Sequence, residues 1–337
     1  MKRYDKIARV ARIQAASSDL TRSVPACIEL LIHPIIHTLI KFRSGEGITD
    51  QQIERMEESS TTDSMAAHFA GGQLSASTGS SAQGTQVPRC TLDQAFRHCA
   101  EITAAHYENF PVASLFLPEE KRPYIQAIYA FSRIADDFAD EPNLLPAERL
   151  AKLHDWESML RECYDGRAEH PVFIALEETV KRNRIPIEPL IDLLAAFKRD
   201  VMQNRYETFG DLLSYCRCSA NPVGRLVLLI FGHRDEALFA LSDHLCTALQ
   251  LTNFWQDVFV DAGKDRLYIP LEDMHRFGYS LESWRSRVVD GHFKALMKFE
   301  VERTKAMFYD GAELPSLVEK ELQIELRMVW FGGMSIL

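Results

Sequence analysis

The cysteine pairing that builds a disulfide framework is missing from this sequence of 337 residues. Its seven cysteines are scattered, and none forms a C-x-x-C pair. This usage excludes a small disulfide-stapled domain and favours a reducing compartment. We expect Cys216 and Cys218 to be packing residues, because a lone C-x-C lacks the second cysteine pair that zinc sites usually have.

The sequence also lacks a basic surplus and a nucleotide fingerprint. Lysine and arginine number 38 against 48 aspartate and glutamate, which leaves a net charge of −10. This balance argues against nucleic acid as a partner, although carboxylates can still bind an anionic substrate through a bridging metal ion. There is no G-x-G-x-x-G motif, which weighs against a reductive step with NADPH without excluding it.

No long apolar run is present either. The most apolar early segment, residues 28–40, contains Glu29, His33 and Pro34 and is shorter than the roughly 20 apolar residues of a membrane-spanning helix. We therefore predict a cytoplasmic protein that contacts a membrane only peripherally, at the inner face.

Composition changes near residue 90. Between residues 59 and 88 the one charged group is Asp63, and residues 71–86 are mostly Gly, Ser, Thr, Ala and Gln. Such a segment has too little apolar surface to offset the entropy of ordering. We predict that residues 1–90 form a poorly ordered extension with a Gly/Ser-rich linker. Whether it is a tether, an unprocessed leader or a misassigned start stays open.

From residue 91 onward the apolar residues recur at helical spacing, and no alternating strand of useful length is found. The breaks between helices fall mainly at prolines. Residues 91–337 are therefore predicted to form one all-α domain that is large enough to enclose a central cavity. The predicted helices span residues 92–107, 122–139, 147–163, 171–182, 188–202, 209–218, 223–231, 235–260 and 292–309.

A polar stripe marks the helix predicted over residues 122–139 and continues to the next residue, Asp140. Tyr129, Arg133, Asp136 and Asp140 are offset by 0, 4, 7 and 11 positions. At about 100° per residue these side chains fall within an arc of about 60°. They therefore share one face of the helix.

A second stripe lies on the apolar helix predicted over residues 235–260. Gln250, Asn253, Asp257 and Asp261 are offset by 0, 3, 7 and 11 positions, an arc of about 80°. Carboxylates on so apolar a helix are costly to bury unless cations compensate them. A solvated acidic face could explain either stripe alone. The pair favours Mg²⁺ ions that clamp a diphosphate leaving group between two helices.

These motifs resemble the squalene/phytoene synthase family of head-to-head prenyltransferases. The similarity rests on the run from Tyr129 to Glu141 (YAFSRIADDFADE), on the run from Gln250 to Pro270 (QLTNFWQDVFVDAGKDRLYIP), and on the segment HYENFP that begins at His106. The resemblance implies the class I isoprenoid (terpenoid) synthase fold with a deep central cavity, Mg²⁺ as cofactor, and a prenyl diphosphate substrate.

Within the family the sequence is most similar to the hydroxysqualene synthases of bacterial hopanoid biosynthesis. The similarity includes the runs SANPVGR from Ser219 and WFGGM from Trp330, and Gln256 stands where many phytoene synthases carry Arg or Lys. The implied reaction converts presqualene diphosphate to hydroxysqualene. The alternatives are condensation of two farnesyl or geranylgeranyl diphosphates, and a non-catalytic relative that acts as an assembly factor.

The resemblance also assigns roles to individual residues. The implied Mg²⁺ ligands are Asp136, Asp140, Asn253, Asp257 and Asp261. The implied substrate-binding residues are His106, Phe110, Arg133, Gln250, Asn253 and Arg266, and the aromatic residues assigned to catalysis are Tyr129 and Tyr215. For the two arginines an ion pair with a neighbouring aspartate is the alternative to a diphosphate contact. For His106 and the aromatic residues the alternative is a structural role.

Asp137 and Glu141 each lie about 100° from an aligned aspartate, and we expect them to support the ligands or to face solvent. Pro222 and Gly224 interrupt a helical run, either as a kink that lines the cavity or as a turn between helices. A long-chain product is also expected to leave into a bilayer or to other enzymes of the squalene pathway.

Overall fold

Helices make up all the regular structure in the computed structural model, which describes residues 90–105 and 118–337. The predicted all-α class is confirmed for these residues. The predicted extension, apart from its last residue, lies outside the described residues, as do His106 and Phe110. The α-helices are α5 (Leu92–Ala105), α7 (Arg122–Asp140), α8 (Pro146–Tyr164), α9 (Pro171–Asn183), α10 (Glu188–Met202), α11 (Phe209–Ser219), α12 (Asn221–Ile230), α13 (Glu236–Gln256), α14 (Val258–Asp261), α15 (Leu271–Phe277), α16 (Leu281–Arg285), α17 (Gly291–Asp310) and α18 (Lys320–Ile336), with short 3-10 turns at Ala262–Lys264 and Leu314–Ser316.

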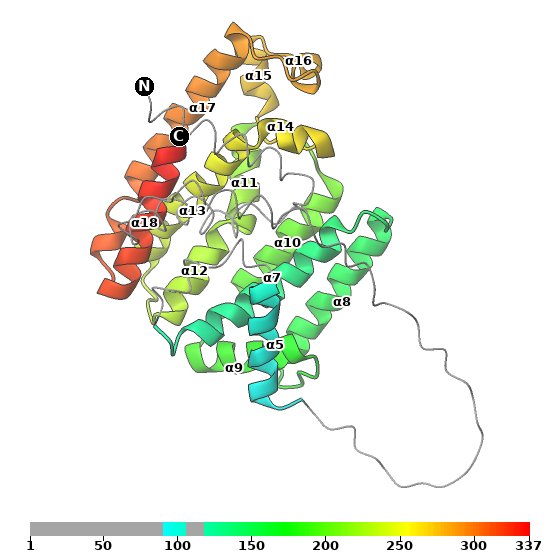
Figure 1. The fold of residues 1–337 in the computed structure, drawn as a ribbon, viewed down its shortest axis with the longest axis vertical. Coiled ribbons are helices and arrows are strands. Elements are labelled where there is room, and N and C mark those ends of the chain that lie inside the picture. Colours follow the sequence, from blue (N-terminus) through cyan, green and yellow to red (C-terminus); the bar gives the residue numbers. More distant parts are fainter. Residues whose placement is uncertain (1–89, 106–117) are drawn as a thin grey trace, which may run out of the picture.

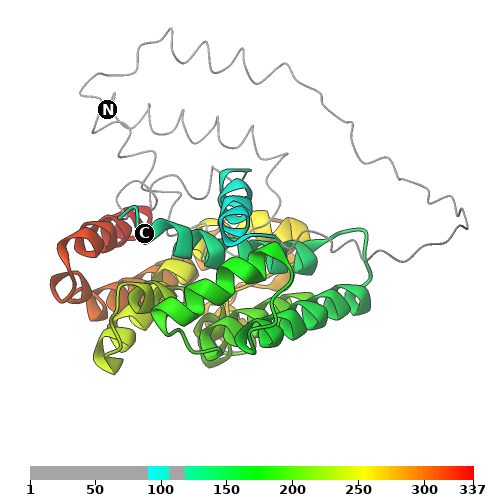
Figure 2. The same cartoon turned by 90° about the horizontal axis from the view of Figure 1, so that it is seen from below.

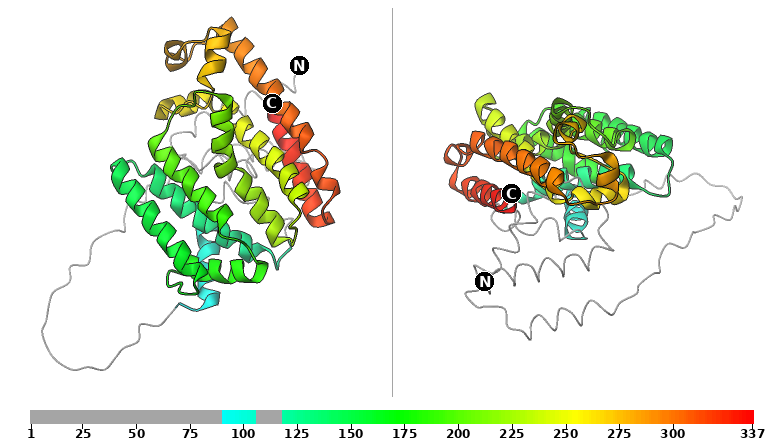
Figure 3. Two further views of the ribbon diagram at one scale, coloured as in Figure 1. Left: turned by 180° about the vertical axis from the view of Figure 1, so that it is seen from behind. Right: turned by 90° about the horizontal axis from the view of Figure 1, so that it is seen from above.

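Two central helices organise the domain, and each carries one of the predicted stripes. Helices α5, α8, α9 and α10 pack around α7, whereas α12, α17 and α18 pack around α13 (Figure 1). Helix α5 projects from one face (Figure 2), and α8 and α10 run side by side on the opposite face (Figure 3). Helices α10, α11 and α12 pack against one another and connect the two halves.

Helix α7 is held by an aromatic cluster behind its polar stripe. Phe131 is fully buried, and its ring lies 6.2 Å from the ring of Trp156 on α8 and 5.9 Å from that of Phe173 on α9. The Trp156 indole Nε1 also donates a hydrogen bond of 3.2 Å to the Phe131 backbone carbonyl. Burial of each large side chain contributes about 1.5–3 kcal/mol, so this cluster fixes the helix that presents the first stripe.

Helix α13 is buried on all sides over most of its C-terminal half. Every residue from Leu245 to Trp255 is buried, including the polar ones. A helix that is covered all round belongs in the centre of a domain. Some of its polar groups bond to neighbouring helices: Thr247 donates to Asn221 on α12 at 2.8 Å, and Trp255 donates to Thr304 on α17 at 2.8 Å.

The interruption at Pro222 is a turn between helices, so the alternative of a kink within one helix is wrong. Helix α11 ends at Ser219, and Pro222 lies in the first turn of α12, where its missing N–H costs no helical bond. Gly224 serves close packing instead. A Cβ atom there would lie 2.2 Å from Ser242 Oγ and 2.6 Å from Cys246 Sγ on α13. The two helices can approach this closely because position 224 carries no side chain.

The structure differs from the predicted helices in two respects. The helix expected over residues 235–260 is divided at Asp257 into α13 and α14. Helices α15, α16 and α18 were not predicted. Helices α15 and α16 span only 7 and 5 residues, too few to show a period. The apolar stripe of α18 is interrupted by buried Glu325 and Gly333. The predicted packing roles of Cys216 and Cys218 agree with their places in the core around α11.

Among the described residues, none of the helices is long and apolar enough to cross a membrane.

Candidate active site

The first stripe lies along one buried face of α7, as the spacing predicted. Tyr129, Arg133 and Asp136 are 4 to 5% exposed, and Asp140 ends the helix half-buried. Arg133 forms an ion pair of 2.6 Å with Asp137 and lies 3.8 Å from Asp136. The ion pair expected as the alternative for Arg133 is therefore present in the structure. Asp137 itself is exposed.

The carboxyl group of Asp136 is poorly compensated. Its Oδ2 atom accepts no hydrogen bond from the described residues. Burial raises the pKa of Asp136 well above its ordinary value, and the charge of Asp140 raises it further although Arg133 opposes the change. A divalent cation would relieve this unfavourable environment, because it supplies the positive charge that the protein provides only in part.

The second stripe begins inside α13 and ends beyond it. Gln250 and Asn253 are buried on the helix, and the Gln250 Oε1 atom has no hydrogen-bond partner among the described residues. The continuous helix that the 80° arc assumed is wrong. Helix α13 ends at Gln256, Asp257 lies in the break, and Asp261 is the last residue of α14. The backbone bond from Asp257 N–H to Asn253 C=O, 2.8 Å, nevertheless keeps Asp257 next to the final helical turn.

The chain returns from α14 toward the end of α7. Asp265 adopts a left-handed conformation with φ 54°, which reverses the backbone after the 3-10 turn. The next residue, Arg266, forms an ion pair of 2.6 Å with Asp140, and Lys264 lies 3.9 Å from the same carboxylate. The structure thus brings the end of the second motif to the end of the first.

Both carboxylates of the second motif have raised pKa values, mainly because they are buried. Burial, the charge of Asp257 and that of Asp140 raise the pKa of Asp261 to about 7, against the opposing effect of Arg266 and Lys264. Burial likewise raises the pKa of Asp257, which Lys264 partly offsets. Together with the ion pair between Arg266 and Asp140, this effect of Asp140 on Asp261 is consistent with acidic groups of the two motifs that lie near one another.

Sequence reasoning missed Asp200 on α10, which extends this acidic region. Tyr215 donates a hydrogen bond of 3.0 Å to its Oδ2 atom. Burial raises the pKa of Asp200 to about 7, while the charge of Arg266 and the Tyr215 hydrogen bond lower it and Asp140 raises it. A signal was available in the sequence: Asp200 continues the apolar stripe of Leu193, Ala196 and Phe197, where a carboxylate is out of place.

Four aromatic rings form a wall beside this acidic region. Phe254 and Tyr268 stack with centroids 3.7 Å apart, and the rings of Tyr206 and Tyr215 lie 5.5 Å apart. Tyr268 also stacks with Tyr206 at 5.8 Å and lies 6.0 Å from Tyr215. Only Tyr215 of these four was predicted as a site residue; Tyr206 and Phe254 had no distinguishing spacing. This aromatic wall places π faces next to the acidic groups.

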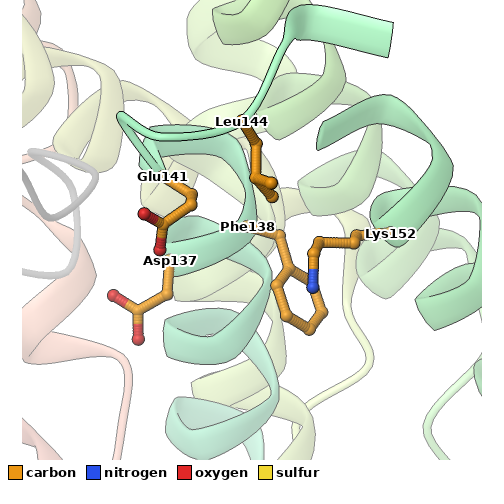
Figure 4. A pocket seen from close by; sticks show the side chains of 5 residues that line it. All are labelled: Asp137, Phe138, Glu141, Leu144 and Lys152. Carbon is orange, nitrogen blue, oxygen red and sulfur yellow. The ribbon is translucent and has the colours of Figure 1, made fainter. Parts of the chain in front are cut away.

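A pocket of about 320 Å³ lies on a different side of the end of α7. Figure 4 shows the carboxylates of Asp137 and Glu141 on one side of the helix and Phe138 with Lys152 on the other. The Lys152 ammonium lies 5.1 Å from the centre of the Phe138 ring. This pocket does not include the aligned aspartates, and the deep central cavity stays a prediction.

The oxygen donors of the two motifs fit Mg²⁺ only if phosphate and water supply its remaining ligands. Among the described residues, no three histidine, cysteine, aspartate or glutamate side chains lie close enough to hold one ion by themselves. Mg²⁺ typically uses one or two carboxylates and takes its other ligands from phosphate and water. The carboxylate and amide oxygens of the two motifs match that preference, and the raised pKa values of Asp136, Asp257 and Asp261 show acidic groups that a cation would stabilise.

Comparison with known proteins identifies the family of this chain. Residues 103–337 match the squalene/phytoene synthase family. The 15-cis-phytoene synthase of Synechococcus elongatus is 33% identical over 232 residues, which are 65% of this chain and 74% of the relative. The hydroxysqualene synthase of Zymomonas mobilis is 43% identical over 179 residues, 51% of this chain and 57% of the relative.

Solved structures show the same fold. The squalene synthase HpnC from Alicyclobacillus acidocaldarius is 41% identical with a TM-score of 0.70, and the match covers 73% of this chain and 92% of that one. A dehydrosqualene synthase solved with a ligand is 26% identical with a TM-score of 0.66, over 72% and 85% of the two chains. The chain therefore belongs to the squalene/phytoene synthase family and is an isoprenoid synthase of the head-to-head type.

Proposed function

We propose that this enzyme converts presqualene diphosphate to hydroxysqualene in a reaction that requires Mg²⁺. The observation that carries the proposal is the convergence of acidic groups from α7 and α14, joined by the ion pair between Arg266 and Asp140. The likeness to a hydroxysqualene synthase, at 43% identity, supports this member of the family. The step belongs on the route to squalene and hopanoids.

The metal would be held by oxygen ligands from both motifs. These are Asp136 and Asp140 on α7 and Asn253, Asp257 and Asp261 on the other side. Bound Mg²⁺ would supply the positive charge that stabilises diphosphate as a leaving group. Asp140 is already paired with Arg266, so substrate binding must exchange this contact.

Arg266, Arg133 and the Gln250 amide would complete the part of the site that binds the diphosphate. The guanidinium of Arg266, held at the junction of the two motifs, matches the fork geometry of a phosphate. Arg133 lies on the stripe and would orient Asp136 while it contacts the diphosphate. The oxygen of the buried Gln250 amide has no hydrogen-bond partner among the described residues and could orient substrate or water.

The aromatic wall would protect the cation that forms when diphosphate leaves. The π faces of Tyr215, Phe254 and Tyr268 attract positive charge without offering a covalent bond. Tyr129, which is buried on the α7 stripe, would serve the same purpose from the other helix. Tyr129, Tyr215 and Phe254 are buried and Tyr268 is partly buried, so these rings would keep bulk water away from the reacting carbon.

Incubation with defined substrates tests the proposal. The purified full-length chain with Mg²⁺ should release diphosphate from presqualene diphosphate and form hydroxysqualene, identified by mass spectrometry. It should leave farnesyl diphosphate unchanged. Accumulation of presqualene diphosphate from farnesyl diphosphate, or of phytoene from geranylgeranyl diphosphate, would instead establish the condensing activity. That second candidate is favoured by the longer matches to phytoene synthases, 232 residues against 179.

We further propose that the enzyme works at the cytoplasmic membrane surface and hands its product to other enzymes of the squalene pathway. The product is strongly apolar, and Tyr309 and Phe331, which both contact the Trp330 ring, are 63% and 62% exposed on α17 and α18. The full chain should sediment with phosphatidylglycerol vesicles, and Tyr309→Ser with Phe331→Ser should reduce that binding. Recovery in the supernatant at low salt would contradict membrane contact.

A further inference from the structure

A carboxylate and two tyrosine side chains lie close together near the segment between α10 and α11, outside the two metal motifs: the Tyr215 hydroxyl is hydrogen-bonded to Asp200, and the rings of Tyr206 and Tyr215 are 5.5 Å apart. Asp200 lies near the end of α10, Tyr206 in the segment that follows, and Tyr215 on α11. The Tyr215 hydroxyl donates a hydrogen bond to Asp200, so the oxygen of that hydroxyl can still accept a hydrogen bond from another group. We call Asp200, Tyr206 and Tyr215 the carboxylate–tyrosine cluster.

Backbone contacts place this cluster beside the diphosphate end. The Leu267 N–H donates to the Asn204 carbonyl at 3.0 Å, and the Leu271 N–H donates to the Tyr206 carbonyl at 3.0 Å. The segment that carries Tyr206 therefore runs along the segment that carries Arg266. The opposing effects of Arg266 and Asp140 on the pKa of Asp200 agree with this placement.

The Tyr206 hydroxyl is buried, and none of the residues that the structure describes is its hydrogen-bond partner. The residue is 1% exposed, and its oxygen makes no hydrogen bond to the described residues. Buried polar atoms are nearly always satisfied, by protein or by an ordered water. A water needs two to four polar partners, and Tyr206, Tyr215 and Asp200 supply that number. The unsatisfied Tyr206 hydroxyl therefore indicates that a small polar ligand such as water binds beside it.

The charges of the cluster suit a water that must lose a proton. Burial raises the pKa values of Tyr206 and Tyr215, and the charge of Asp200 raises them further, so both hydroxyls stay neutral. Burial also raises the pKa of Asp200 to about 7, against the charges of Arg266 and Arg199 and the Tyr215 hydrogen bond; nearby Asp140 adds to the increase. A carboxylate of this kind accepts a proton near neutral pH.

We propose that the carboxylate–tyrosine cluster binds the water molecule that captures the carbocation. The inference rests on the proposed conversion to hydroxysqualene. The water accepts a hydrogen bond from Tyr206 and donates one to Asp200, while a lone pair of its oxygen forms the new bond to carbon. One O–H bond of the water breaks, and its proton passes to Asp200. The product is the neutral alcohol.

The aromatic wall explains why a bound water is needed. The stacked rings of Phe254 and Tyr268 exclude water from the surroundings of the cation, and the cation can otherwise lose a proton to form a hydrocarbon. One bound water at a fixed position makes the alcohol the preferred product. The cluster therefore acts on the product and not on ionisation of the substrate.

Tyr206→Phe in the full-length enzyme tests the site. We expect diphosphate release from presqualene diphosphate within about threefold of the unaltered enzyme, and a fall of about tenfold in the ratio of hydroxysqualene to hydrocarbon products, the effect of one lost hydrogen bond. Incorporation of ¹⁸O from labelled water measures the capture step. Tyr279→Phe is the matched control, because it removes a buried hydroxyl that donates to the Val288 carbonyl, with no member of the cluster involved.

Asp200→Asn provides a second test, since the amide keeps an acceptor but takes up no proton. We expect the same change of products, and a pH profile of the alcohol fraction that loses its rise near pH 7. An unchanged product ratio in Tyr206→Phe, with diphosphate release intact, would overturn the inference even if Asp200→Asn were inactive. Failure of the unaltered enzyme to release diphosphate from presqualene diphosphate would instead refute the proposed function.

Discussion

Helix α7 and the α13–α14 segment carry the same kind of acidic motif but support it differently. Helix α7 runs without interruption through Asp136 and Asp140. The other segment breaks at Asp257 and resumes as a helix of 4 residues. The cations that neutralise Asp140 come from the second segment, through Arg266 and Lys264. Among the described residues, neither Asp257 nor Asp261 has an ion pair of its own within 4.0 Å.

This difference separates Asp140, which is compensated before any metal binds, from the other three aligned carboxylates. Burial raises the pKa values of Asp136, Asp257 and Asp261, and the charge of Asp257 adds to the increase at Asp261. A divalent cation therefore stabilises these three carboxylates more than it stabilises Asp140. The break at Asp257 frees the chain after α13 to bring Arg266 across to α7.

The largest effect is expected from removing a carboxylate of the second motif. Asp257→Asn should lower kcat with presqualene diphosphate by about 10²–10³-fold, because it removes a carboxylate ligand of the metal that would stabilise the leaving group. The circular dichroism spectrum should be unchanged. Asp137→Asn is the control on the first motif. Its carboxylate is exposed, so we expect a change of less than about threefold. Full activity of Asp257→Asn would contradict the metal role.

Breaking the link between the two motifs should have the next largest effect. Arg266→Gln should lower kcat/KM by about 10–100-fold, the range for one charge-assisted hydrogen bond, measured as diphosphate release. Lys264→Gln should change it by less than about threefold, since Lys264 is 40% exposed and lies 3.9 Å from Asp140. Equal losses in the two variants would show that the contact at 2.6 Å has no special part.

The requirement for Mg²⁺ should depend on pH through the second motif. A metal binds the ionised carboxylate, and the pKa of Asp261 is raised to about 7. Below pH 7 protons compete, so the Mg²⁺ concentration for half-maximal activity should rise about tenfold per pH unit, and it should level off above pH 8. In Asp261→Asn this slope should disappear. A slope that persists would place the titrating group elsewhere.

The smallest effect on activity is expected from the packing that holds α13. Gly224→Ala places a Cβ within 2.2 Å of Ser242 Oγ and should lower the free energy of unfolding by about 1–3 kcal/mol. Thermal or urea unfolding measures it, and kcat of the folded fraction should change by less than about twofold. Gly291→Ala, which meets open space at the start of α17, is the matched control and should not destabilise. An equal loss in both variants would exclude the contact with α13 as the cause.

Much of the fold could be predicted from periodicity alone. The predicted bounds of α10 agree with the structure, and those of α7, α8 and α9 differ by one or two residues, because long amphipathic helices between prolines have strong local signals. Helices α15 and α16 could not be predicted, since they are too short to show a period. Helix α18 was missed because Glu325 and Gly333 interrupt its apolar stripe.

The site, like the fold, has residues that local spacing predicted and residues that it could not predict. Residue spacing placed Arg133, Asp136 and Asp140 on one face of α7, because that helix is regular and obeys the 100° rule. Spacing marks Asp200 as a carboxylate out of place on an apolar stripe, but it could not show that Asp200 belongs to the site. Asp200 is bonded to Tyr215 on the next helix and feels the charge of Arg266, 66 positions further along the chain, and interactions between separate elements leave no periodic signal in the sequence.

The amino-acid sequence by itself determined the helical class, the two acidic motifs and the faces on which most of their side chains lie, because these depend on neighbours within a few residues. Only the tertiary structure decided that the chain breaks at Asp257, that Arg266 pairs with Asp140, and that Tyr215 bonds to Asp200 with the Tyr206 ring beside it. The physical reason is that a buried charge takes its partners from whichever elements the packing of the core brings beside it.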